Sequence, residues 1–132
     1  MATPSLESRW KAISRLDAIG AVATLSTLVA LGLAPIGWTG IPSGVYAALA
    51  LVAAFYAWNS YRAYLQPSGP AVVRIGLLNL AYAALAIGVL WSFHSQIQPL
   101  AAACFLLEMA IVVPLAIVEI RLGSARPEGD VR

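Results

Sequence analysis

The sequence has few charged side chains. Lys, Arg, Asp and Glu make up 11% of its 132 residues, whereas about a quarter of an ordinary soluble domain is charged. Hydrophobic residues make up 61% of the chain, and the mean hydropathy is +0.82. A water-soluble fold of this size could not cover its surface with so few polar groups. The composition therefore excludes an ordinary soluble domain and indicates an integral membrane protein.

Cysteine and histidine are equally scarce, with one residue of each, Cys104 and His94. One cysteine cannot form an internal disulfide, and no Cys or His cluster has the spacing of a metal site. The sequence therefore indicates no metal and no other cofactor. It also lacks a nucleophile–base pair and a basic, aromatic module for nucleic acid. We expect a non-enzymatic protein that does not bind nucleic acid.

The apolar residues lie in four long blocks: 16–33, 45–64, 72–93 and 99–120. Each has roughly the 17 to 25 residues that a helix needs to cross a bilayer. The segments between them are rich in proline and glycine, which favour turns. The period-two alternation of barrel strands is absent. We predict a single all-α integral membrane domain with four transmembrane helices in an up-down-up-down bundle.

The basic residues fall on one side of this four-span arrangement. They are Arg9, Lys11, Arg15, Arg62, Arg74, Arg121, Arg126 and Arg132. The positive-inside rule then places both termini and the second loop in the cytoplasm. An Ala-rich composition with more Arg than Lys is typical of bacterial proteins from GC-rich genomes. We therefore expect a multi-pass protein of the bacterial inner (plasma) membrane.

The two ends of the chain have their own patterns. In residues 1–15, Leu6, Trp10 and Ile13 recur at helical spacing among basic residues. This pattern fits a juxtamembrane amphipathic helix on the inner leaflet, and it fits equally well an extension of the first span. Residues 123–132 are polar and are predicted to be a disordered tail.

Polar side chains inside the spans are the candidate functional residues. Glu108 lies near the middle of the fourth span, and hydroxyl and amide side chains occur at matching depth in the other three. With these sides turned inward they would form a polar layer of Glu108, Asn79, Tyr82, Tyr56, Thr24 and Thr27. Because a buried charge is costly there, the protonated acid is the expected state of Glu108.

Two roles remain open for Glu108. As a neutral acid bonded to Asn79 or Tyr82, it would fasten helix to helix. In a water-accessible cavity, it would carry a proton or bind a cation. A second set of charged residues lies at the inner boundary and is predicted to form ion pairs that anchor the bundle. This set comprises Asp17, Arg15, Arg74, Glu119 and Arg121.

One close-packing motif is present. Ala84-x-x-x-Gly88 in the third span predicts a seam of small residues, either inside the bundle or between protomers. Its position in the middle of a span makes it the better of the small-residue motifs in the chain.

Three functional hypotheses follow. The first is a structural or accessory membrane subunit, whose partners are the bilayer and either further copies of the chain or a larger membrane protein. The alternative is a small transporter or channel, coupled to protons or cations through Glu108. The third is a membrane enzyme or lipid-binding protein in which Glu108, Tyr82 and Asn79 contact a bound lipid or quinone.

Overall fold

The computed structural model describes residues 5–125, and all regular structure in that range is helical. The helices are α1 (Leu6–Leu33), α2 (Ile36–Thr39), α3 (Ser43–Leu65), α4 (Gly69–Ser92) and α5 (Pro99–Gly123). The prediction of an all-helical fold is confirmed for these residues. The structure has five helices where four transmembrane helices were predicted, because the first loop contains α2, a single helical turn between Pro35 and Gly40.

The helices begin where the sequence supplies capping groups. The Ser5 hydroxyl accepts a hydrogen bond from the Ser8 amide at 3.3 Å, at the start of α1. Ser68 does the same for the Ala71 amide at 3.4 Å, at the start of α4. α5 begins with Pro99, whose missing amide hydrogen costs nothing in a first turn. Local sequence therefore sets these boundaries.

α1 is one uninterrupted helix from Leu6 to Leu33. Residues 6–15 are therefore continuous with the first span, which is consistent with both interpretations of residues 1–15; residues 1–4 lie outside the described range. The indole N–H of Trp10 donates to the Leu122 carbonyl oxygen at 3.1 Å, so the start of α1 is attached to the end of α5. Gly123, the first residue of the predicted tail, is the last residue of α5; residues 126–132 lie outside the described range.

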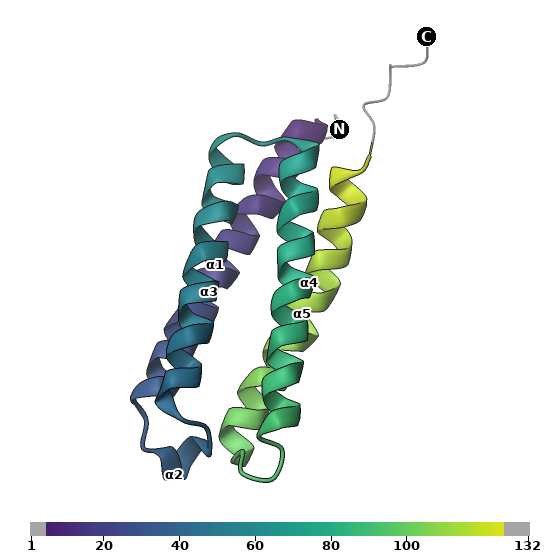
Figure 1. The fold of residues 1–132 in the computed structure, drawn as a ribbon. Helices are drawn as coiled ribbons and strands as arrows, with labels where there is room; N and C mark the ends of the chain where they lie inside the picture. Colours follow the sequence, from purple (N-terminus) through teal and green to yellow (C-terminus); the bar gives the residue numbers. More distant parts are fainter. Residues whose placement is uncertain (1–4, 126–132) are drawn as a thin grey trace.

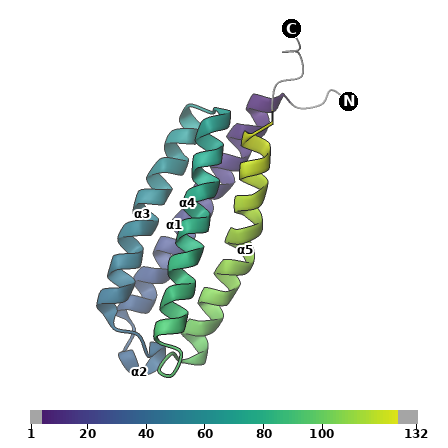
Figure 2. The same ribbon diagram turned by 45° about the vertical axis from the view of Figure 1, so that its right-hand side comes forward.

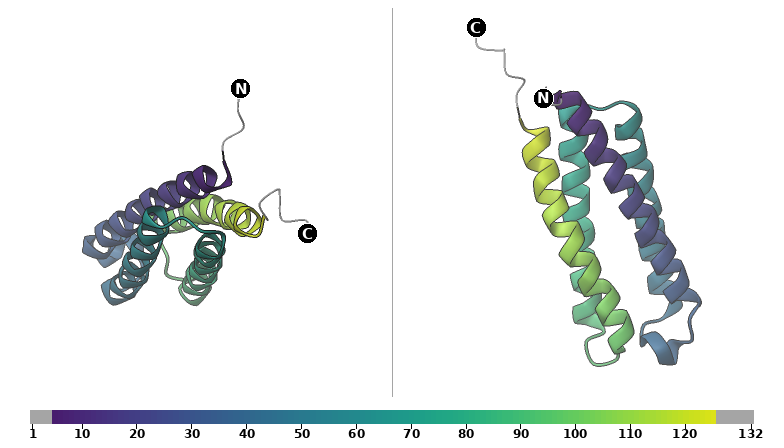
Figure 3. Two further views of the ribbon diagram at one scale, coloured as in Figure 1. Left: turned by 90° about the horizontal axis from the view of Figure 1, so that it is seen from above. Right: turned by 180° about the vertical axis from the view of Figure 1, so that it is seen from behind.

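The four long helices lie side by side, and each runs opposite to the one before it (Figures 1 and 2). α1 packs mainly on α3, and α4 packs mainly on α5. The view from above shows the four helices around a common centre (Figure 3). At the end far from the termini, the Gln98 amide donates to the Thr39 carbonyl at 3.0 Å and joins the two loops. The fold is therefore two helical hairpins that meet along their length.

Within the described residues, three helices are long and apolar enough to cross a membrane: α1, α4 and α5. α3 has 23 residues, which is long enough, but it does not meet the same criterion of hydropathy. Tyr56, Trp58 and Asn59 in its second half lower the apolar content. The structure thus supports a membrane protein. The number of helices able to span the membrane, judged by length and composition alone, is three.

Small residues allow α4 and α5 to approach closely at Gly76. A Cβ atom at Gly76 would lie 2.8 Å from the Ala116 carbonyl oxygen and 2.8 Å from Cγ1 of Ile120. The predicted seam at Ala84 and Gly88 does not pack inside the chain, because both residues are exposed and nothing lies within 4 Å of a Cβ built at Gly88. Both residues lie on the outward side of α4, which is consistent with the second alternative, a seam between protomers; the inward side is the one that carries Gly76, Asn79 and Tyr82.

Candidate functional site

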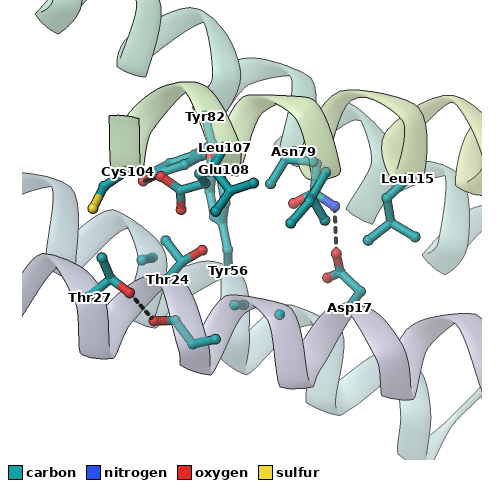
Figure 4. Close-up of a pocket in the computed structure, with 16 residues that line it drawn as sticks. Asp17, Thr24, Thr27, Tyr56, Asn79, Tyr82, Cys104, Leu107, Glu108 and Leu115 are labelled. Atoms are coloured by element: carbon teal, nitrogen blue, oxygen red, sulfur yellow. Dashed lines mark hydrogen bonds between the residues drawn. The ribbon is translucent and has the colours of Figure 1, made fainter. Parts of the chain in front are cut away.

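A cavity of about 360 Å³ lies where the two hairpins meet. Its walls come from all four long helices, with α1 and α5 contributing most of the lining (Figure 4). The lining is predominantly apolar, and the exposed side chains of Leu107 and Ile111 lie at its edge on α5. The cavity is therefore open between α1 and α5, on the side of the bundle rather than at an end.

All six residues of the predicted polar layer line this cavity: Thr24, Thr27, Tyr56, Asn79, Tyr82 and Glu108. Thr24 and Glu108 lie across it from each other, on α1 and α5 (Figure 4). Thr27 lies at the exposed edge, where its hydroxyl donates to the Ala23 carbonyl of its own helix at 3.0 Å. Asp17, which was predicted to lie at the inner boundary, also lines the cavity.

Among residues 5–125, Glu108 accepts one hydrogen bond, from the facing helix α4. The Tyr82 hydroxyl donates to Oε2 of Glu108 at 3.1 Å, and the Tyr82 ring meets the Tyr56 ring edge to face, with centroids 6.1 Å apart. The second oxygen, Oε1, is buried and has no hydrogen-bond partner among residues 5–125. A buried polar atom without a partner costs free energy, so Glu108 retains one unused hydrogen-bonding position beside the cavity.

The second polar centre joins one side chain from each long helix, and we call it the carboxyl–amide cluster: Asp17, Ser60, Asn79 and Glu119. The Asn79 amide nitrogen donates to Oδ1 of Asp17 at 2.6 Å and to Oε2 of Glu119 at 2.9 Å. Ser60 bonds Oδ2 of Asp17. Asp17 is 4% exposed and Glu119 is 0% exposed. One amide therefore holds two buried acids together across the contact between the hairpins.

The predicted inner-boundary ion pairs are wrong. Asp17 and Glu119 bond Ser60 and Asn79, whereas Arg15, Arg74 and Arg121 are all exposed. Helix geometry explains the error, because residues two apart point to opposite sides of a helix. Arg15 is two positions from Asp17, and Arg121 is two positions from Glu119. When the arginine points out of the bundle, the acid therefore points into it.

The same geometry identifies the residues that the sequence analysis missed. Ser60 is two positions before the exposed Arg62, and it takes the inward position that Asp17 and Glu119 take on their own helices. Ser14 is also fully buried and was not considered; its hydroxyl has no partner among the described residues. For three of the four members of the cluster, Asp17, Ser60 and Glu119, a position two residues from an arginine was thus the signal.

The burial of two acids in one cluster favours a retained carboxyl proton. The Ser60 hydroxyl donates to Asp17 Oδ2, and its other neighbour is the Tyr56 carbonyl oxygen at 2.9 Å. Two buried carboxylates with no cation beside them among residues 5–125 would be far more costly. The arrangement suits an acid pair that shares at least one proton.

Residues 5–125 contain no group of three or more His, Cys, Asp or Glu side chains that is placed to hold a metal ion. Cys104 has a free thiol and lines the cavity, where it packs as a small apolar group. The polar groups of the site are thus two acid centres with amide and hydroxyl partners. They can hold protons, form hydrogen bonds or attract a cation.

Compared with protein-family models, curated proteins and solved structures, the chain matches none of them.

Proposed function

We propose that this chain is a non-enzymatic, four-span protein of the bacterial plasma membrane, whose cavity binds a small amphipathic molecule drawn from the bilayer. The observation that carries the proposal is the cavity itself. It is predominantly apolar, it opens sideways between α1 and α5, and a few polar groups from four helices face it. Such a combination is typical of small-molecule sites.

The fourth span, α3, is supported by its outward-facing side chains. Leu51 is 75% exposed, and Phe55 and Trp58 are also largely exposed, which is unfavourable in water and favourable in lipid. α3 also packs along α1 and shares the length and tilt of the other long helices (Figure 1). The start of α1, the α3–α4 loop and the end of α5 lie at the end that carries Arg9, Lys11, Arg15, Arg62, Arg74 and Arg121, so the positive-inside rule places that end in the cytoplasm.

This orientation predicts the outcome of cysteine labelling in intact cells. The native thiol is first removed with Cys104→Ser, and single cysteines are placed at Ser68 and Gln96, which lie in loops at opposite ends of the bundle. A membrane-impermeant maleimide should label the cysteine at 96 and leave the cysteine at 68 unlabelled until the cells are opened. The reverse pattern would overturn the orientation, and labelling of both would overturn α3 as a span.

Ligand binding is tested by filling the cavity. Gly20 lines it, and a Cβ atom there meets nothing within 4 Å, so Gly20→Leu should fit without disturbing the helices. We expect native mass spectrometry of the purified protein to show a bound small molecule, and Gly20→Leu to reduce its occupancy at least tenfold.

The matched control is Gly88→Leu. Gly88 also has nothing within 4 Å, but it lies outside the cavity lining, so occupancy should not change. An empty wild-type protein, or equal occupancy in both variants, would contradict ligand binding and would favour a structural or accessory subunit held together by its acid clusters.

A second candidate function is proton- or cation-coupled transport through Glu108. It is favoured by the unpartnered Oε1 atom beside the cavity, since an intramembrane carboxyl group with a free hydrogen-bonding position can exchange a proton. Reconstituted vesicles should then show pH-driven solute flux that Glu108→Gln abolishes, with Glu7→Gln at an exposed site as the control. Equal flux in both variants would exclude this role.

A further inference from the structure

We infer that the cavity selects amphipathic organic cations, and that each cation displaces a proton from Glu108. This inference rests on the proposed function and adds the chemical class of the ligand. The first observation is the charge of the residues that line the cavity. Two of the lining residues, Asp17 and Glu108, are acids, and none of the lining residues is basic.

The acid that meets the ligand is Glu108. Both oxygens of Asp17 already have donors, from Asn79 and from Ser60. At Glu108, by contrast, Tyr82 occupies only Oε2, and Oε1 has no hydrogen-bond partner in the described part of the chain. A neutral Glu108 is stable in an empty, apolar cavity, but a cation beside Oε1 would stabilise the carboxylate. The cavity therefore contains one carboxyl group, Glu108, at which a cation can replace a proton.

The surroundings of Glu108 favour this exchange over binding of a neutral molecule. The other titratable groups that face the cavity are Asp17 of α1, Tyr56 of α3, Tyr82 of α4 and Cys104 of α5, and none can supply a positive charge. The Tyr56 and Tyr82 rings also line the cavity and attract cations through their π faces. Two acids with no base among the lining residues give the cavity a negative potential as soon as one proton leaves.

The opening of the cavity between α1 and α5 is consistent with an amphipathic ligand. Leu107 and Ile111 on α5 are exposed at the edge of the cavity, so a ligand enters from the acyl-chain region rather than from water. Only a cation with a large apolar surface partitions there. The exchange is balanced: the carboxyl O–H bond of Glu108 breaks, the proton leaves to the solvent, and the ligand's charge replaces it with no change in net charge.

The test uses two probes of nearly equal shape, methyltriphenylphosphonium and triphenylphosphine oxide, with the full chain in phosphatidylcholine nanodiscs. The first is a permanent cation, and the second is neutral with a hydrogen-bond-accepting oxygen. Calorimetry in buffers of different ionisation enthalpy measures proton release. We expect the cation to bind at least tenfold more tightly at neutral pH, to release about one proton, and to gain about tenfold in affinity per pH unit while Glu108 is protonated.

Two variants test whether Glu108 is the group that releases the proton. Glu108→Gln should remove proton release and the pH dependence, whereas Glu7→Gln should retain both. If Glu108→Gln does not fold, the proton release of the unaltered chain still decides the question. Binding of both probes with equal affinity and no proton release, sensitive to Gly20→Leu, would overturn the cation assignment and leave the binding site in place. Binding of neither probe would overturn the cation assignment together with the proposed function.

Discussion

Asn79→Leu should destabilise the fold by about 3 kcal/mol, because one substitution removes the donor from two buried acids. Asn79 bonds Asp17 on α1 and Glu119 on α5, so its loss leaves polar oxygens without partners where the two hairpins meet. Leucine has a similar volume, so cavity formation contributes little. Reversible unfolding in mixed detergent micelles, followed by helicity, measures the change.

The control for this prediction is Asn59→Leu on α3. The Asn59 amide donates only to the Phe55 carbonyl of its own helix, at 2.9 Å, so the same substitution should cost less than about 0.5 kcal/mol. A double-mutant cycle with Asp17→Asn should give a coupling of about 1 kcal/mol or more with Asn79→Leu, since the two side chains are in contact. Equal effects of the two leucine variants, or additive effects in the cycle, would show that the cluster does not hold the hairpins together.

Gly76→Ala should separate α4 from α5 and cost about 1 to 3 kcal/mol. Its added methyl group would lie 2.8 Å from the Ala116 carbonyl oxygen and 3.1 Å from Cβ of Glu119. Both of these belong to a rigid helix, so the helices must move apart. The same displacement lengthens the bond between Asn79 and Glu119, and the carboxyl–amide cluster loosens with it. The unfolding measurement described above detects the loss.

Gly88→Ala provides the matched control in the same helix. Nothing lies within 4 Å of a Cβ at Gly88, so the substitution should stabilise the chain by about 0.5 to 1 kcal/mol through helix propensity alone. If both alanine variants stabilise the protein, α4 and α5 do not pack as closely as the structure places them. If Gly88→Ala destabilises it, the exposed side of α4 contacts another protein chain in the membrane.

The sequence alone was sufficient to predict the long helices, because the interactions that form a helix are local. Long apolar blocks and proline-rich or serine-capped starts determine where α1, α3, α4 and α5 lie, since lipid leaves every backbone group to be satisfied within a helix. Residue counting also placed Glu108, Tyr82, Tyr56 and Thr24 at a common depth, and all four line one cavity. Depth along a helix follows from a fixed rise per residue, so it needs no knowledge of the neighbours.

The sequence could not determine which side of each helix faces its neighbours. Asp17 and Glu119 were predicted to form ion pairs with arginines at the inner boundary, but they bond Asn79, which is 62 and 40 residues away respectively. Rotation about each helix axis is fixed by all the contacts between helices at once, including the close approach at Gly76. The sequence thus determined an all-helical membrane chain with acids at definite depths. Only the tertiary structure decided that two of these acids share one amide and that the third keeps a free oxygen beside a cavity.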